Sequence, residues 1–96
     1  MKVLYANKDI AKIATDKPPP LPYPVIKAAR SRIKFLGYAK DERDIRNWKS
    51  LHYEKLKGDR DGQRSIRLTD QWRMIITIDS SSSPPEVTIH EICDYH

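Results

Sequence analysis

The chain has 96 residues, a formal net charge of +5, 39% hydrophobic residues and 32% charged residues. This length and balance predict one folded domain over residues 1–96 and exclude a disordered chain. No apolar run approaches the ~20 residues of a membrane helix, the start lacks the apolar stretch of a signal peptide, and the single Cys93 excludes an internal disulfide. We therefore expect a cytoplasmic protein that does not engage a membrane.

The positive charge is concentrated in the middle of the chain. Residues 1–22 hold four Lys and two Asp (+2), residues 23–73 hold fourteen Lys or Arg and seven Asp or Glu (+7), and residues 74–96 hold four acidic residues and no Lys or Arg (−4). A basic segment of this size is typical of a surface that meets a polyanion. It is equally compatible with cations that only solvate a small domain.

Two helices are predicted in the first half of the chain, after a short strand over residues 2–5. The first helix begins near Lys8, because Asn7 can cap it and apolar residues then recur at helical spacing. The prolines of residues 18–22 end it and form a stiff connector, since proline fixes one backbone angle and lacks an N–H. The second helix begins at Pro24 and ends at Gly37 or Ala39, and it pairs an apolar stripe (Ile26, Ala29, Ile33, Leu36) with a basic row (Lys27, Arg30, Lys34).

The second half is predicted to form strands. Residues 41–47 resemble one more helical turn, and Trp48 and Leu51 are expected to anchor it to the core. Strands follow over residues 51–56, 63–68, 72–78 and 86–92, with a Gly- and Asp-rich loop at 58–62 and a serine-rich loop at 80–85. The element order predicts an α+β fold, in which two N-terminal helices pack on a mostly antiparallel sheet drawn from residues 51–92.

Alternation predicts which strand residues face the core. In residues 63–68, Ser65 and Arg67 should share one face while Ile66 and Leu68 share the other. In the last strand, alternation places Val87 and Ile89 inward and Thr88 and His90 outward, with a structural or solvent-exposed role for His90.

A set of short motifs in the last ~45 residues resembles the HigB-type toxins of the RelE/ParE superfamily. The matching residues, in chain order, are Leu56-Lys57-Gly58-Asp59-Arg60, Gly62, Ser65-Ile66-Arg67, Trp72-Arg73 and Asp94-Tyr95-His96. The resemblance implies the toxin of a type II toxin–antitoxin module, a ribosome-dependent mRNA endoribonuclease that needs no metal or other cofactor. It also implies neutralisation by a helix-turn-helix antitoxin of the HigA type, with operator DNA bound only through that antitoxin.

The resemblance, together with the chemistry of the side chains, predicts which residues form the active site. RNA cleavage by the substrate's own 2′-hydroxyl needs a proton acceptor, charge neutralisation at phosphorus and a proton donor. The candidate catalytic residues are His96, Asp94, Tyr95, Glu54, Lys57 and Arg73, and the candidate RNA-binding residues are Arg64, Arg67, Arg60 and Lys55. Two other functions remain open: a ParE-like gyrase inhibitor with the same fold, and a degenerate RNA-binding module without catalysis.

The chain departs from the HigB pattern at Glu54, where many of these toxins carry a histidine three residues before the lysine. His52 lies two residues earlier, which on a strand keeps the same face but moves the side chain about 6–7 Å, so it is not expected to substitute directly. Either Glu54 accepts the proton, or the site relies on His96 and Asp94, or Glu54 is a plain surface carboxylate. Cys93 is expected to be a small core residue rather than a nucleophile.

Deletion of His96 is the sequence-based test of the active site. We expect the deletion to abolish growth arrest and ribosome-dependent mRNA cleavage, because an imidazole that titrates near neutrality is our choice for the group that protonates the leaving oxygen. Folding and antitoxin binding should be retained. A soluble His96 deletion that still arrests growth with the same cleavage pattern would contradict the assignment.

Overall fold

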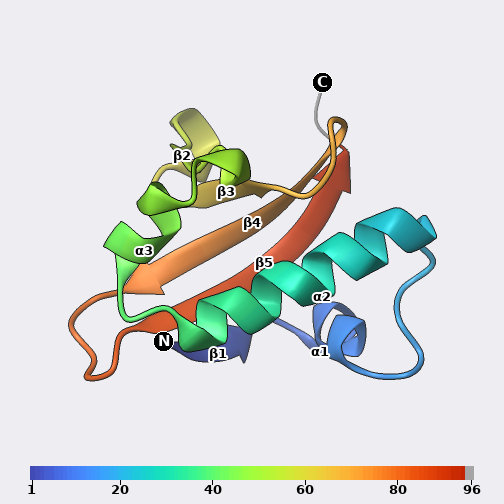
Figure 1. Cartoon of the computed structure of the whole chain (residues 1–96), viewed down its shortest axis with the longest axis horizontal. Helices are drawn as coiled ribbons and strands as arrows, with labels where there is room; N and C mark the ends of the chain where they lie inside the picture. Colours follow the sequence, from blue (N-terminus) through green and yellow to red (C-terminus); the bar gives the residue numbers. More distant parts are fainter. Residues whose placement is uncertain (95–96) are drawn as a thin grey trace.

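The computed structural model describes residues 1–94, which form a five-stranded sheet in the order β1-β5-β4-β3-β2. The helices lie against this sheet (Figure 1). The strands are β1 (Lys2–Tyr5), β2 (Glu54–Lys55), β3 (Arg64–Arg67), β4 (Trp72–Asp79) and β5 (Glu86–Asp94). The helices are α1 (Lys8–Ala11), α2 (Tyr23–Tyr38) and α3 (Glu42–Asn47), with 3-10 turns η1 (Lys12–Ala14), η2 (Lys49–Leu51) and η3 (Gly58–Arg60).

The predicted α+β class is confirmed. Strands β2, β3, β4 and β5 follow one another in the chain, and each pairs antiparallel with the next. Strand β1 pairs parallel with β5 at the edge of the sheet. The sheet is therefore mostly antiparallel. Within residues 1–94, no helix combines the length and apolar character needed to cross a membrane.

Local chemistry explains where the two N-terminal helices begin and end. The Asn7 side chain accepts a hydrogen bond from the Ile10 amide at 2.9 Å, which caps α1 as expected. Helix α1 is only four residues long and continues as η1. Helix α2 begins directly after Pro22 and passes through Gly37. The Met1 ammonium donates to backbone carbonyls at the end of α2, including that of Leu36 at 3.2 Å, where a positive charge is favourable.

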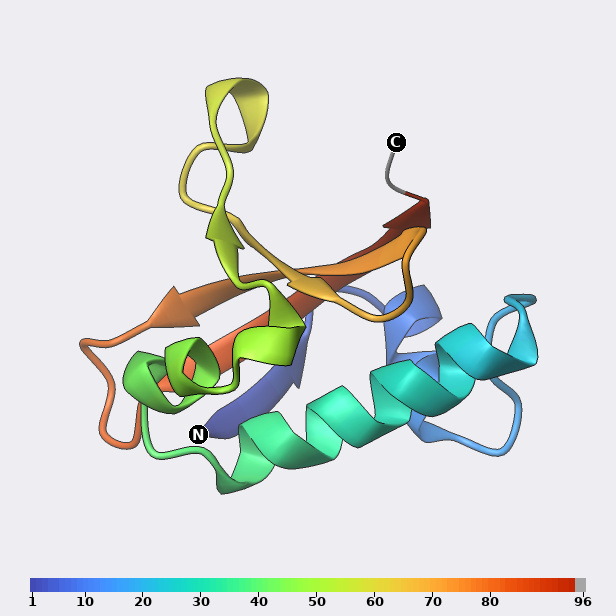
Figure 2. The same ribbon diagram turned by 45° about the horizontal axis from the view of Figure 1, so that its top comes forward.

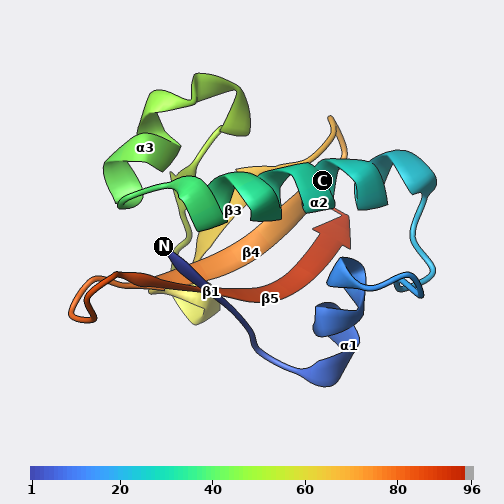
Figure 3. The ribbon, with the colours of Figure 1, turned by 60° about the horizontal axis from the view of Figure 1, so that its bottom comes forward.

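The hydrophobic core lies between α2 and one face of the sheet. Figure 3 shows α2 running across that face, with α1 beside β5. The fully buried residues come from both layers: Val25, Ala29 and Leu36 of α2 face Ile66, Met74, Ile76, Val87 and Ile89 of the strands. Trp48 packs edge-to-face on Phe35 with ring centroids 4.7 Å apart, and Leu51 is fully buried, so both anchor the α3 region as predicted.

Two details of the sheet differ from the sequence prediction. Residues 51–53 are not a strand: Leu51 ends η2, and His52 has left-handed backbone angles of φ 47° and ψ 53°. Ser65, which alternation places on the same face as the charged Arg67, is only 1% exposed.

The core makes a direct stability prediction. Ile89→Ala should lower the free energy of unfolding by about 2–5 kcal/mol, because Ile89 is fully buried and the change leaves a cavity. In a domain of this size that loss corresponds to a fall in melting temperature of at least about 8 °C. Tyr38→Ala, at a residue that is 79% exposed, is the control and should shift the melting temperature little. Equal losses would show that the core is misplaced.

Candidate functional site

A row of cationic side chains crosses the sheet on the face opposite α2, hereafter the outer face. Arg67 of β3 pairs with Arg73 of β4, and Arg73 pairs with Cys93 of β5. Paired residues of neighbouring strands project to the same side. The next pairs along, which include Ile66 and Met74, are buried toward α2, so alternation directs Arg67 and Arg73 to the outer face.

A second row, one step along the strands, is covered by a loop. Ser65 pairs with Ile75, and Ile75 pairs with Glu91. The Arg60 guanidinium lies 3.0 Å from the Glu91 carboxylate, so the segment of residues 56–63 reaches from the β2–β3 side of the sheet to β5. Ser65 and Ile75 of this row are buried, at 1% and 2% exposure. Figure 2 shows the segment around η3 projecting on the side away from α2.

A β-bulge in β5 creates this arrangement. Ile76 pairs with Ile89 but Ile75 pairs with Glu91, so His90 is the extra residue on β5. Simple alternation from Val87 and Ile89 would place Glu91 inward, whereas the bulge turns it outward to meet Arg60. The three-residue spacing from Ile89 to Ile92, which breaks the alternation, is the sequence signal that could have revealed it. His90 itself is half-buried, with Nε2 2.9 Å from the Thr77 hydroxyl.

His52 lies at the arginine row, in a turn rather than on the strand that the sequence prediction assumed. Nε2 of His52 accepts a hydrogen bond from Arg67 at 3.2 Å, and Arg67 also pairs with Asp70. Because arginine can only donate, Nε2 of His52 is the acceptor in this contact. The 6–7 Å offset assumed a strand, and the left-handed turn at His52 removes that assumption.

The other predicted residues lie at different distances from this row. Glu54 pairs with Ser65, so it faces outward and stands one row from Arg67. Lys57 is exposed at the start of η3. Asp94 ends β5, pairs with Trp72 and accepts a hydrogen bond from Gln71 at 3.0 Å. The remaining two, Tyr95 and His96, lie outside the described residues.

Arg64 and Lys55 are not part of the outer face. They pair with each other, and Arg64 also pairs with Ile76, whose side chain is buried toward α2. Nε of Arg64 lies 3.8 Å from Glu42 of α3, which also accepts a hydrogen bond from Tyr53 at 2.7 Å. Burial and this hydrogen bond raise the pKa of Tyr53 well above its usual range. Arg64 thus helps to attach α3 to the sheet.

Cys93 occupies the arginine row but is poorly suited to nucleophilic chemistry. Burial raises the pKa of its thiol, and the negative charge of Glu91 raises this pKa further. The thiol therefore stays protonated near neutral pH. Among the described residues, no group of three or more His, Cys, Asp or Glu side chains could hold a metal ion.

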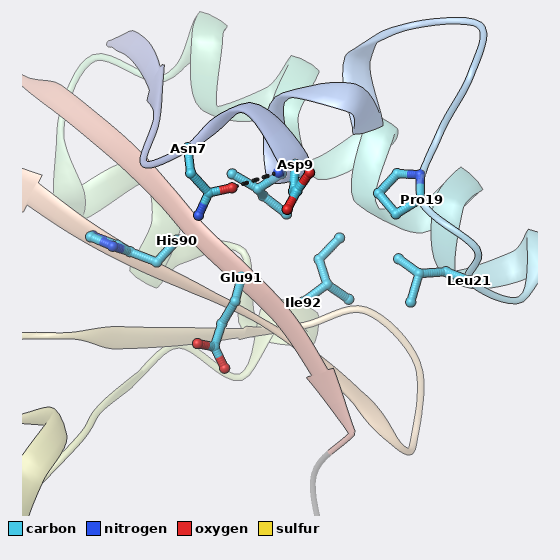
Figure 4. A pocket seen from close by; sticks show the side chains of 8 residues that line it. Asn7, Asp9, Pro19, Leu21, His90, Glu91 and Ile92 are labelled. Atoms are coloured by element: carbon cyan, nitrogen blue, oxygen red, sulfur yellow. Dashed lines mark hydrogen bonds between the residues drawn. The ribbon is translucent and has the colours of Figure 1, made fainter.

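A pocket of about 250 Å³ lies away from the arginine row, between α1, the proline connector and β5. Leu21 of the connector stands opposite Ile92 of β5 (Figure 4). The lining of this pocket includes Asp9 and Glu91 and no Lys or Arg. It therefore offers no cation to an anionic substrate, and the arginine row is the better candidate site.

Comparisons with known proteins identify solved structures with a similar fold. No protein-family model matches the chain, and no curated protein matches it. Among solved structures, the YoeB/ParE toxin from Agrobacterium tumefaciens has a TM-score of 0.61 at 16% identity, with both chains covered completely. The toxin–antitoxin complex RelBE2 from Mycobacterium tuberculosis has a TM-score of 0.53 at 16% identity, covering 99% of this chain and 96% of that one.

A further solved structure gives the same result. The YoeB dimer from Staphylococcus aureus has a TM-score of 0.53 at 19% identity, covering 100% of this chain and 97% of that one. At these identities the likeness defines the fold alone. The chain has a RelE/YoeB-like toxin fold, with its five-stranded sheet and its helices in a mixed α+β arrangement.

The loop over the outer face gives a prediction. Glu91→Gln removes the charge that holds Arg60, and we expect faster amide hydrogen exchange over residues 57–62. Both side chains are 45% exposed, so the pair is worth at most about 1 kcal/mol and the melting temperature should change by no more than about 4–8 °C. Asp9→Asn, which breaks the exposed Lys12–Asp9 pair on α1, is the control. Unchanged exchange at 57–62 would mean that other contacts hold the loop.

Proposed function

We propose that this protein is the toxin of a type II toxin–antitoxin module of the RelE/ParE superfamily, an endoribonuclease that cleaves mRNA on the translating ribosome. Its fold is that of the YoeB, ParE and RelE toxins, and one of those relatives was solved as a toxin–antitoxin complex. A HigA-type helix-turn-helix antitoxin neutralises it and links the complex to operator DNA. The HigB-like motifs support this subclass.

The observation that carries the proposal is the pairing of Arg67 with Arg73 on the outer face. Two arginines directly opposite each other concentrate positive charge at one point of the sheet, where Asp70 also pairs with Arg67. Concentrated positive charge of this kind attracts a polyanion. Two guanidinium groups side by side suit the phosphates on either side of a scissile RNA linkage.

The residues around the arginine row can supply acid–base chemistry. In the free protein, Arg67 occupies the lone pair of His52 Nε2. When a phosphate engages Arg67, this nitrogen is released next to the substrate. His52 then accepts the proton of the 2′-hydroxyl while O2′ attacks phosphorus and the P–O5′ bond breaks. Glu54, one row away on the same face, is the rival base.

The remaining roles follow the resemblance. Lys57 and Arg73 neutralise charge that develops on the phosphorane, and Arg60 holds the loop that borders the site. Asp94, Tyr95 and His96 are proposed as the orienting, base-stacking and proton-donating groups. The residue types and the motif support these roles. Deletion of His96 tests its role as the proton donor.

His52→Asn tests the proposed base. Asparagine tolerates the left-handed backbone of His52, so the fold should persist, while loss of the imidazole should lower the rate of ribosome-dependent mRNA cleavage about 100-fold or more. Arg67→Gln should lower cleavage as strongly, because it removes a phosphate ligand. The measurement is cleavage of a defined mRNA by purified protein on programmed ribosomes, with circular dichroism to verify folding.

The matched control is Glu54→Gln, which changes the neighbouring carboxylate on the same face. A small effect of Glu54→Gln beside a large effect of His52→Asn supports His52, and the reverse result would make Glu54 the base. Wild-type protein that cleaves no mRNA but inhibits supercoiling by DNA gyrase would replace the ribonuclease proposal with the ParE-like function. Activity in neither assay, with RNA binding retained, would identify a non-catalytic module.

A further inference from the structure

The solvent face of α2 carries two exposed aromatic rings. Tyr23 is 70% exposed and Tyr38 is 79% exposed, and among residues 1–94 no other large hydrophobic side chain is classed as exposed. They lie at the two ends of the same helix, 15 residues apart. At 1.5 Å per residue, this separation is about 22 Å. The other tyrosines of the described chain are half-buried, so this exposure is particular to α2.

Cationic side chains fill the same face between the two rings. At 100° per residue, Tyr23, Lys27, Arg30, Lys34 and Tyr38 all fall within an arc of about 80°, and all five are exposed. We call these five residues the α2 stripe. Helix α2 contains four Lys or Arg and no Asp or Glu, so no carboxylate on the helix neutralises them. The opposite arc, with Ala29 and Leu36, is buried in the core.

A hollow in the middle of the stripe adds a shaped site. It has a volume of about 240 Å³ and is lined by Ala14, Arg30, Ile33 and Lys34. Arg30 is held in place because it donates to the carbonyl oxygens of Ile13 at 2.9 Å and Thr15 at 2.6 Å. The hollow therefore combines the apolar side chains of Ala14 and Ile33 with the fixed guanidinium of Arg30 and the exposed ammonium of Lys34. This combination suits a phosphate with its adjoining sugar or base.

We propose that the α2 stripe is a second nucleic-acid surface that binds single-stranded RNA. Lys27, Arg30 and Lys34 contact successive phosphates, and unpaired bases stack on Tyr23 and Tyr38. The alternation of cations with exposed aromatic rings favours a single strand, because a duplex offers no free base faces to the tyrosines. The α2 stripe and the arginine row lie on opposite sides of the sheet, so the stripe anchors RNA away from the proposed cleavage site.

Binding of a non-cleavable RNA measures this surface directly. The probe is a fluorescein-labelled, unstructured 20-nucleotide RNA with 2′-O-methyl groups, followed by anisotropy over a series of salt concentrations. Lys27→Gln/Lys34→Gln should lower the slope of log affinity against log salt by about 1.4, at roughly 0.7 for each lost phosphate contact with a single strand. Tyr23→Leu/Tyr38→Leu should weaken binding by about 5-fold or more for each ring without changing the slope.

The matched control is Lys2→Gln/Lys8→Gln, which removes the same charge from two exposed lysines outside the stripe. This control should leave the slope nearly unchanged, and circular dichroism should show all variants folded. Equal slopes for the two lysine doubles, or tyrosine variants that bind as wild type, would overturn the proposal. The proposal would also be overturned if the lysine variants bound RNA as the wild type does but no longer bound an acidic protein. The assay is independent of cleavage, so its failure is distinguishable from a failure of the ribonuclease proposal.

Discussion

The structure depends on burying one face of strands β3, β4 and β5 against the single helix α2. Ile66, Met74, Ile76 and Ile89 are fully buried on that face, where they meet α2. Because side chains alternate along a strand, this packing also determines what the other face carries. Arg67, as the neighbour of Ile66, must point outward. The position of the cationic surface therefore follows from the packing of the core. A shift of strand register by one residue would change both faces of the sheet.

The outer face gathers residues that are distant in the chain. His52 comes from a left-handed turn before β2, Arg67 from β3, Arg73 from β4 and Glu91 from β5, and the β2–β3 loop closes across them through Arg60. Residues 74–96 contain no Lys or Arg, and β5 contributes Glu91, which pairs with Arg60 of the loop. The strands therefore differ in charge on the outer face: β3 and β4 present arginines, and β5 presents a carboxylate.

Much of the fold could be predicted from the sequence, and the errors have identifiable physical causes. Periodicity located α2, β3 and β4, because each buries one continuous face, and it located β5 as far as Ile89, where the bulge interrupts the alternation. The start of β2 was misplaced because Leu51 to Glu54 alternate apolar and polar residues as a strand does, whereas Leu51 ends η2 and His52 adopts a left-handed turn. The pairing of Arg64 with Glu42, which lies 22 positions earlier, and the contact of His52 with Arg67 could not be predicted from the sequence, because both depend on tertiary structure.

The bulge at His90 has a consequence for comparing this protein with others. A bulge adds one residue to β5 without lengthening the strand that it pairs with. A relative with a regular β5 would need a single-residue gap at this point when the two sequences are aligned. An alignment without that gap would match outward residues of one chain to inward residues of the other from Glu91 onward. Sequence similarity would then disappear over the strand that borders the site, even where the three-dimensional arrangement is preserved.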